Sequence, residues 1–146
     1  MDFVSICSKC GLNNDSGICV GCGSNHTPIN IHQQLHKVVE MLIKMGVGVI
    51  GSDVQLYTSH NSSISIYLAA AVPEHLFNGL PSSWELQYYD LKSIGAKVYQ
   101  LCCYPENDDN TYSIDNMINN LECWLKDKDP DGFKSMLRLA EYDVGI

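Results

Sequence analysis

Four cysteines near the start of the chain are the residues whose types and spacing most clearly predict chemistry. They form two CxxC pairs separated by eight residues, namely Cys7, Cys10, Cys19 and Cys22. A CxxC pair lets two sulfurs point toward one centre, and the glycine directly after each pair lets the backbone fold back without a Cβ clash. Two such pairs placed face to face supply the tetrahedron of thiolates found in structural zinc sites. The spacing therefore predicts one closed, four-sulfur metal site.

Other uses of these cysteines fit the sequence less well. A thioredoxin-like redox pair expects a single CxxC beside a βαβ pattern, which this sequence lacks. Disulfides are typical of exported chains, whereas the start MDFVSIC has an acidic residue where a signal peptide needs a basic one. Iron in a rubredoxin-like site remains the main competitor to zinc.

Residues 7–23 resemble the zinc-ribbon family, whose pattern is CxxCG, a short hairpin and a second CxxCG. The connection between the pairs is rich in turn residues from Asn13 to Gly17, as a short hairpin requires. The resemblance implies that the four cysteines bind one structural zinc ion as cofactor. Because sulfur fills all four positions, no place remains for water or substrate, so we expect the site to be structural rather than catalytic.

The charge balance limits the partners that the chain can bind. Lys and Arg total 9 against 17 Asp and Glu, a formal net charge of −8, and no basic cluster occurs. Nucleic-acid binding requires cationic patches, so we expect no direct binding to nucleic acid, whereas a basic protein partner fits. No apolar run reaches the roughly 18 residues that span a bilayer. Without a signal sequence, the expected location is cytoplasmic.

The hydrophobic periodicity downstream predicts an α+β fold. We expect a helix over 28–45, strands over 54–59 and 63–68 joined by a turn at His60–Asn61, a helix over 82–95, a strand over 96–105, and helices over 113–126 and 129–142. The prediction is a zinc ribbon in residues 1–25, followed by an acidic α+β domain in residues 26–146. The second domain would form a small two-layer sandwich in the order α-β-β-α-β-α-α, with a ferredoxin-like arrangement as one option.

The stretch Asp127–Gly132 matches the opening of a calcium loop, D-x-D-x-D-G. The twelfth position, which should be a bidentate glutamate, is Arg138, and Pro130 also departs from the pattern. The favoured interpretation is a helix junction in which Asp129 is the N-cap and Pro130 the first helical residue. Calcium binding remains the alternative.

Two histidines, His32 and His36, stand four residues apart in the first predicted helix, a spacing that can bind zinc. The HExxH metalloprotease motif needs glutamate directly after the first histidine, and Gln33 occupies that position. We therefore interpret this stretch as a solvated helix face, on which His36 can pair with Glu40.

Cys102 and Cys103 stand side by side in a predicted strand, so their side chains point to opposite faces. At least one is expected to be a small buried residue. A cysteine nucleophile needs a histidine base, and the sequence places neither His60 nor His75 beside them.

Three classes of function follow from these residues. The favoured one is a non-enzymatic protein-interaction module, with a small regulator or inhibitor as a subclass. The second is a transcription- or replication-associated factor acting through protein contacts, because Lys9 is the only cation between Met1 and Asn25. The third is an enzyme whose pocket gathers His60, His75 or Asp90 on the α+β domain.

Overall fold

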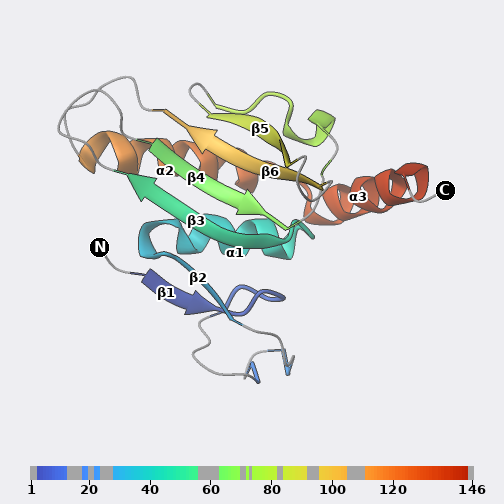
Figure 1. The fold of residues 1–146 in the computed structure, drawn as a ribbon, viewed down its shortest axis with the longest axis horizontal. Helices are drawn as coiled ribbons and strands as arrows, with labels where there is room; N and C mark the ends of the chain where they lie inside the picture. The colour runs from blue at the N-terminus through green and yellow to red at the C-terminus, as the bar shows by residue number, and fades with distance from the viewer. Residues whose placement is uncertain are drawn as a thin grey trace.

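The computed structural model describes residues 3–12, 18–19, 22–23, 28–55, 63–69, 72, 74–81, 84–91, 96–104 and 111–144. The fold is α+β (Figure 1). Its elements are β1 (Phe3–Ile6), β2 (Ile29–His32), the 3-10 turn η1 (Gln33–Leu35), α1 (His36–Lys44), β3 (Val49–Gln55), β4 (Ser63–Leu68), the 3-10 turn η2 (Glu74–Phe77), β5 (Trp84–Leu91), β6 (Ala96–Cys103), α2 (Thr111–Lys126) and α3 (Pro130–Val144).

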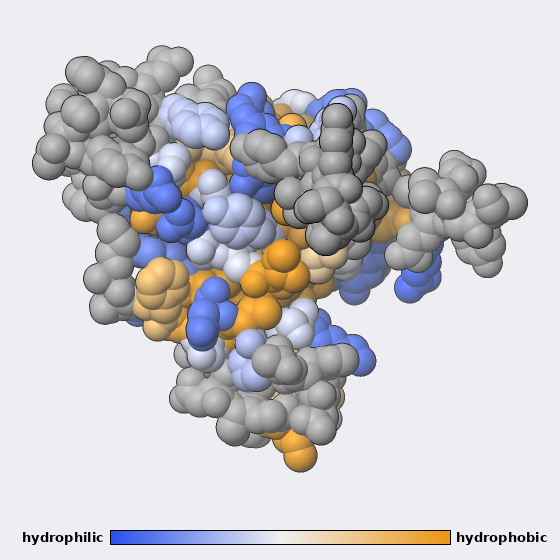
Figure 2. All heavy atoms as spheres, viewed as in Figure 1, coloured by the Kyte–Doolittle hydropathy of each residue, from blue (hydrophilic) through white to orange (hydrophobic). Residues whose placement is uncertain are grey.

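A four-stranded antiparallel sheet forms the centre of the molecule, in the order β3-β4-β6-β5. Strand β4 shows why the sheet has two different faces. Ile64, Ile66 and Leu68 are buried and alternate with half-buried polar residues, the period of two expected for a strand with one face on a core. The opposite face is turned to the viewer in Figure 1, and residues of hydrophilic to intermediate hydropathy lie over its middle in Figure 2.

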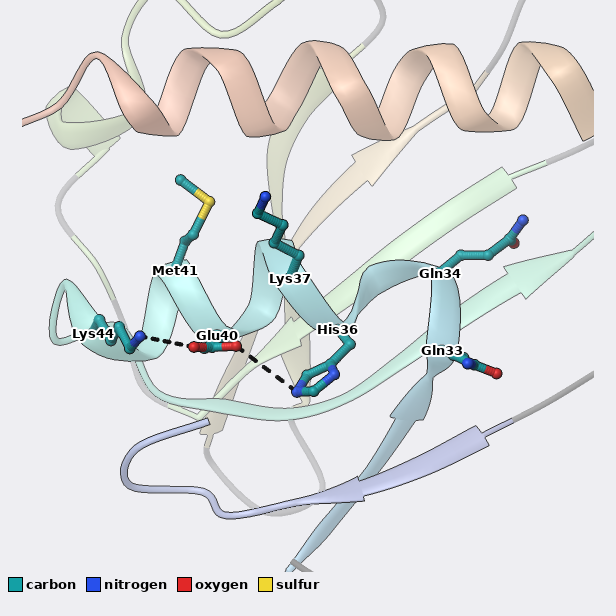
Figure 3. Close-up of a pocket in the computed structure, with 7 residues that line it drawn as sticks. All are labelled: Gln33, Gln34, His36, Lys37, Glu40, Met41 and Lys44. Carbon is teal, nitrogen blue, oxygen red and sulfur yellow. Dashed lines mark hydrogen bonds and ion pairs between the residues drawn. The ribbon is translucent and has the colours of Figure 1, made fainter. Parts of the chain in front are cut away.

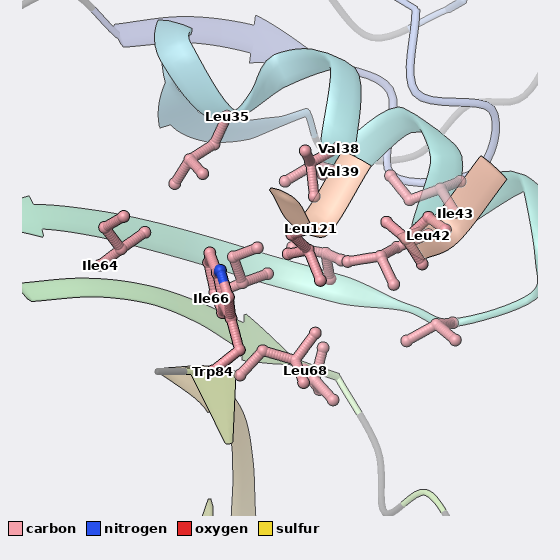
Figure 4. Packing of buried hydrophobic residues seen from close by; sticks show 14 of the residues in the cluster. Leu35, Val38, Val39, Leu42, Ile43, Ile64, Ile66, Leu68, Trp84 and Leu121 are labelled. Carbon is pink, nitrogen blue, oxygen red and sulfur yellow. The ribbon is translucent and has the colours of Figure 1, made fainter. Parts of the chain in front are cut away.

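Helices α1 and α2 cover the apolar face of the sheet, so the architecture has two layers as predicted (Figures 1 and 4). Leu42 of α1 and Leu121 of α2 are fully buried in the core with Ile66 of the sheet. Trp84 closes the core on β5, and its indole N–H donates to the carbonyl of Met117 at 2.9 Å. The polar end of this large side chain is therefore satisfied inside the protein.

Strands β1 and β2 form a separate antiparallel pair, in which Phe3 faces His32 and Ile6 faces Ile29. The backbone N–H of His32 donates to Ser52 Oγ on β3 at 2.8 Å, which joins this pair to the main sheet. The prediction that the first helix begins near residue 28 is therefore wrong. Ile29 and Ile31 alternate with polar residues, and β1 supplies a pairing partner that periodicity in one segment does not reveal.

The predicted helix over 82–95 is also wrong, because Trp84–Leu91 is strand β5, paired with β6 along its whole length. Its aromatic residues favour a strand, and a partner of eight residues outweighs the capping signal at its start. Helices α1 and α2 thus stand before and after four strands, which does not match the ferredoxin-like alternation.

Four of the remaining elements, β4, β6, α2 and α3, lie where they were predicted. Strand β3 spans Val49–Gln55, so it begins five residues before the predicted strand over 54–59 and shares only Val54 and Gln55 with it. The turn at His60–Asn61 and the residues between the two cysteine pairs, 13–17, lie outside the described residues. The division into residues 1–25 and 26–146 stays a prediction.

Candidate metal centre

Two tight backbone turns carry the four cysteines. The first follows β1 directly, where the N–H of Gly11 donates to the carbonyl of Cys7 at 2.9 Å. The second repeats this geometry, with the N–H of Gly23 donating to the carbonyl of Cys19 at 2.8 Å. Both glycines have positive φ, 81° for Gly11 and 72° for Gly23. Positive φ is strained for residues with a Cβ, which explains why glycine follows each CxxC pair.

The turns bring all four sulfurs within 4.8 Å of one another. The Sγ atoms of Cys7 and Cys22 are 3.7 Å apart, and those of Cys10 and Cys19 are 3.5 Å apart. A tetrahedral ion with Zn–S bonds of about 2.3 Å places its sulfurs about 3.8 Å apart. These two pairs are therefore close to the separation that one tetrahedral metal ion requires.

The pKa of Cys10 reflects its place among the other three thiols. A backbone hydrogen bond with Leu12 lowers the pKa of Cys10, whereas burial and hydrogen bonds with the other three cysteines raise it, to a net value of about 12. Neighbouring thiolates repel one another, and a bound cation would remove this repulsion by taking the place of the proton on Cys10.

The first turn rests directly on α1. His36 Nε2 donates to the carbonyl of Gly11 at 2.9 Å. A Cβ added to Gly11 would lie 2.9 Å from the Cα of Glu40, closer than such contacts allow. The glycine after the first CxxC pair therefore serves both the turn and the contact with the helix. The sequence signals the first role, but not the second, because the helix residue lies far along the chain.

A shallow groove of about 510 Å³ runs along the exposed side of α1, beside this contact (Figure 3). The carboxylate of Glu40 lies between Lys44 and His36. Its Oε1 is 2.7 Å from Lys44 Nζ, and its Oε2 is 4.0 Å from His36 Nε2. Lys37 instead binds Glu122 of α2 at 2.9 Å, which lowers the pKa of that carboxyl. Both lysines of the groove are thus engaged in ion pairs within the protein.

The other predicted metal candidates do not assemble in the part of the chain that the structure describes. There, the four cysteines are the only group of three or more Cys, His, Asp or Glu residues arranged to hold an ion. His32 is buried on β2, where its ring packs edge-on against Phe3 at 5.6 Å, while His36 contacts Gly11. Sequence reasoning wrongly placed both histidines on one helix.

The stretch Asp127–Gly132 forms the junction between α2 and α3. The backbone N–H of Asp131 donates to Asp129 Oδ1 at 3.2 Å, and that of Phe133 donates to the carbonyl of Asp129 at 2.9 Å. These bonds fit the helix-junction interpretation. His75 lines a small hollow beside the junction, whereas His60 lies outside the described residues.

Cys102 and Cys103 are fully buried and lie on opposite faces of the sheet, as predicted. Cys102 donates to Gln87 Oε1 at 3.5 Å. Burial raises the pKa of Cys102 to about 11, with a contribution from Glu85, and burial raises that of Cys103 to about 12. Neither thiol has the low pKa of a nucleophile.

Comparisons with known proteins found no match to the chain among protein-family models, curated proteins or solved structures. Within the described residues, none of the helices is both long and apolar enough to cross a membrane. Sequence reasoning missed two exposed apolar residues beside the cysteines, Leu12 and Ile18. The sequence offered one signal for them, because Leu12 directly follows Gly11 of the first motif and Ile18 directly precedes Cys19 of the second.

Proposed function

We propose that this chain is a non-enzymatic protein-interaction module whose N-terminal ribbon is held by one structural zinc ion. The ligands would be Cys7, Cys10, Cys19 and Cys22. The observation that carries this proposal is the closed cluster of four sulfurs with apolar side chains exposed directly beside it. Four thiolates complete a tetrahedral shell, so zinc in this site would stabilise the fold and leave no position for substrate.

The interaction surface that we propose is the ribbon tip, defined as Leu12 and Ile18. Leu12 is 42% exposed and Ile18 is 66% exposed. Each stands one residue from a turn that the metal would hold, since Leu12 follows Gly11 and Ile18 precedes Cys19. Exposed apolar side chains on a rigid support lose little entropy on binding, which favours protein contacts.

The partner's chemistry follows from charge. The chain carries a formal net charge of −8 before any metal is bound. A basic protein would be attracted over a long range, and an acidic one repelled. A small regulator or inhibitor that occupies a cationic surface of its target is the specific role that this charge supports.

Metal analysis and partner capture test the two halves of the proposal. Protein purified without chelator should contain about one equivalent of zinc, because a closed four-thiolate site binds zinc tightly. Less than about half an equivalent, or iron in its place, would refute the zinc assignment.

The partner test uses matched surface variants. Leu12→Ser/Ile18→Ser removes the ribbon tip, and Ile50→Ser changes an apolar side chain that is 57% exposed on β3 instead. Quantitative mass spectrometry of proteins retained from native lysate should show a defined partner with the wild type and Ile50→Ser, but not with the tip variant. Equal retention by all three proteins would overturn the assignment of the tip. A retained transcription or replication protein would identify the narrower role predicted from the ribbon.

A further inference from the structure

The four cysteines of the metal centre lie in two close pairs, and each pair spans the two turns. Cys7 Sγ lies 3.7 Å from Cys22 Sγ, and Cys10 Sγ lies 3.5 Å from Cys19 Sγ. Cys7 and Cys10 belong to the first turn, and Cys19 and Cys22 belong to the second. An S–S bond of about 2.0 Å requires the sulfurs of each pair to approach by about 1.5 Å. The same four sulfurs are therefore close to a second closed arrangement, in which covalent bonds join the turns.

Solvent access differs between the two members of each pair. Cys22 is exposed and Cys10 is half-buried, whereas Cys7 and Cys19 are each 1% exposed. A small oxidant such as a peroxide can therefore reach one sulfur of each pair, while the buried sulfur lies beside it. An accessible thiol with a neighbouring thiol that can displace the added oxygen is typical of cysteines that form disulfides reversibly.

The other three cysteines of the described chain are arranged differently. Cys102 and Cys103 are fully buried and point to opposite faces of the sheet. Cys123 is exposed on α2 and lies outside the group of four sulfurs. Disulfides within one chain are therefore expected in the N-terminal cluster, whereas Cys123 is placed to join two chains.

We propose that the four cysteines are also a site of reversible oxidation, at which a peroxide joins Cys7 to Cys22 and Cys10 to Cys19 in competition with zinc. The inference rests on the proposed zinc site, since it concerns the regulation of the same four sulfurs. In each pair, the accessible thiol attacks one peroxide oxygen and becomes a sulfenic acid, and the other oxygen leaves as water. The buried thiol then attacks the sulfenic sulfur, the S–S bond forms and a second water leaves. One peroxide is thus reduced for every two thiols oxidised.

Zinc and the disulfides exclude each other at this site. Zinc binds thiolates, and a sulfur in a disulfide has no thiolate to donate. Oxidation of either pair leaves two thiols, fewer than a closed four-sulfur site requires. The ribbon thus has two alternative supports, which are zinc under reducing conditions and two disulfides in the presence of a peroxide. Either support holds the turns beside Leu12 and Ile18, the two residues of the ribbon tip.

Disulfide mapping of the full chain tests the proposed pairing. The chain is treated with hydrogen peroxide in the presence of a chelator, its remaining thiols are alkylated, and it is digested with trypsin and the protease Asp-N. Cleavage after Lys9 and before Asp15 places Cys7, Cys10 and the two cysteines of the second turn on three different peptides. We expect disulfides to join all three peptides until a dithiol reductant separates them.

Fragmentation of the joined peptides between Cys19 and Cys22 assigns each partner. Cys7 should be bonded to Cys22, and Cys10 to Cys19. Disulfides within each turn, the opposite cross-turn pairing, or sulfinic acids in place of disulfides would overturn the proposal.

Two variants that each lack two of the zinc ligands compare the pairs directly. Cys7→Ser/Cys22→Ser retains Cys10 and Cys19, one from each turn, whereas Cys7→Ser/Cys10→Ser retains both cysteines of the second turn. The first variant should form its disulfide at least about tenfold faster at the same peroxide concentration, because its two sulfurs already face each other. Equal rates, or a faster reaction in the second variant, would contradict the cross-turn arrangement.

A zinc-loaded sample treated in parallel measures the competition with the metal. It should form the disulfides at least about tenfold more slowly than the chelated chain, because zinc holds the thiolates. The oxidised chain should take up less than about a tenth of an equivalent of zinc until a dithiol reductant restores binding. Cys123→Ser should behave like the wild type in both measurements. Equal oxidation rates with and without zinc, or zinc uptake by the oxidised chain, would overturn the competition.

Thermal melting tests whether the disulfides support the fold. The oxidised chain should melt about 5 °C or more above the reduced and chelated chain, since each disulfide restricts the unfolded state. An equal or lower melting temperature would overturn the second support. A chain that binds zinc but forms no cross-turn disulfides would refute this inference and keep the proposed zinc site. Cross-turn disulfides in a chain that binds no zinc would refute the zinc site and leave the site of oxidation standing.

Discussion

The chain uses cysteine in two regions with opposite results. In the N-terminal turns, four cysteines separated by two or eight residues bring their sulfurs within 4.8 Å of one another. On β6, two cysteines adjacent in sequence point to opposite faces of the sheet, and each is enclosed by other side chains. The side chains of Cys102 and Cys103 are therefore kept apart although the residues are adjacent in sequence. The turns bring the sulfurs of the four N-terminal cysteines together although those residues are farther apart in sequence.

The difference lies in the backbone path rather than in the thiol. A glycine turn reverses the chain so that both sulfurs of a CxxC pair face one centre, whereas the pleat of a strand turns neighbours apart. In both regions the pKa of a thiol is raised, to about 12 for Cys10 and Cys103. Hydrogen bonds with the other thiols contribute to the raised pKa of Cys10, whereas burial is the main cause of the raised pKa of Cys103. A bound cation would therefore stabilise thiolates in the first region, where several sulfurs share one centre, but not in the second.

The largest expected effect comes from removing one sulfur of the N-terminal cluster. Cys10→Ser leaves three thiolates and a weak oxygen ligand, so zinc affinity and the folding energy that zinc supplies should fall together. We expect the melting temperature to drop by about 10 °C or more, measured by circular dichroism with zinc content determined in parallel. Cys123→Ser, on the exposed side of α2, is the control and should keep both. Equal melting curves for the two variants would contradict a structural metal.

The next effect separates the two glycines of the cluster. Both have positive φ, but a Cβ on Gly11 would meet the backbone of Glu40, whereas a Cβ on Gly23 would meet nothing within 4 Å. Gly23→Ala should cost about 1 kcal/mol of unfolding free energy from backbone strain alone. Gly11→Ala should cost about 3 kcal/mol or more, because the turn must also move away from α1.

Chemical denaturation of the zinc-loaded proteins measures this difference. If Gly11→Ala and Gly23→Ala lost the same stability, the contact between the first turn and α1 would have no energetic role. His36→Ala provides an independent check, since it removes the bond to the Gly11 carbonyl without adding a clash.

A smaller effect is expected in the second region. Cys103→Ser places a hydroxyl in the apolar core opposite Ile64 and Trp84, and should lower the unfolding free energy by about 1–3 kcal/mol. Zinc content should stay unchanged, which distinguishes this loss from that of Cys10→Ser. A loss of zinc in Cys103→Ser would show that the two regions do not act independently.

The contrast between the regions also explains how much could be predicted from the sequence. The doubled CxxCG pattern is local, so the spacing of Cys7 to Cys22 was sufficient to predict the cluster of sulfurs that the structure shows. The α+β class, α2 and α3 followed from strong periodicity and from punctuation by glycine and proline.

Features that depend on distant partners could not be predicted in the same way. Ile29–His32 and Trp84–Leu91 carry patterns compatible with helix or strand, and pairing with β1 and β6 decides between them. The same limit applies to the site, where the contact of Gly11 with Glu40 joins residues far apart in sequence. The intrinsic preference of a segment for helix or strand predicts its structure poorly wherever pairing and packing with distant residues contribute more stabilisation than that preference does.

The smallest expected effect leaves stability unchanged and concerns only thiol reactivity. In the zinc-loaded chain at pH 8, iodoacetamide should label Cys123, which is exposed, and spare the others. Zinc would shield the N-terminal thiols, while burial and pKa values of about 11 and 12 protect Cys102 and Cys103. A chelator should expose the N-terminal cysteines to labelling, and a denaturant should be needed for the last two.

Peptide mass spectrometry at each stage assigns the label to its residue. Raising the pH should favour Cys102 before Cys103, because the lower pKa gives it more thiolate at any pH between the two values. Labelling of Cys102 at pH 8 in the folded chain would show an accessible thiolate on the sheet. That result would contradict the conclusion that burial protects the cysteines of β6. Resistance of the N-terminal thiols after the chelator would instead show that packing, and not the metal, protects them.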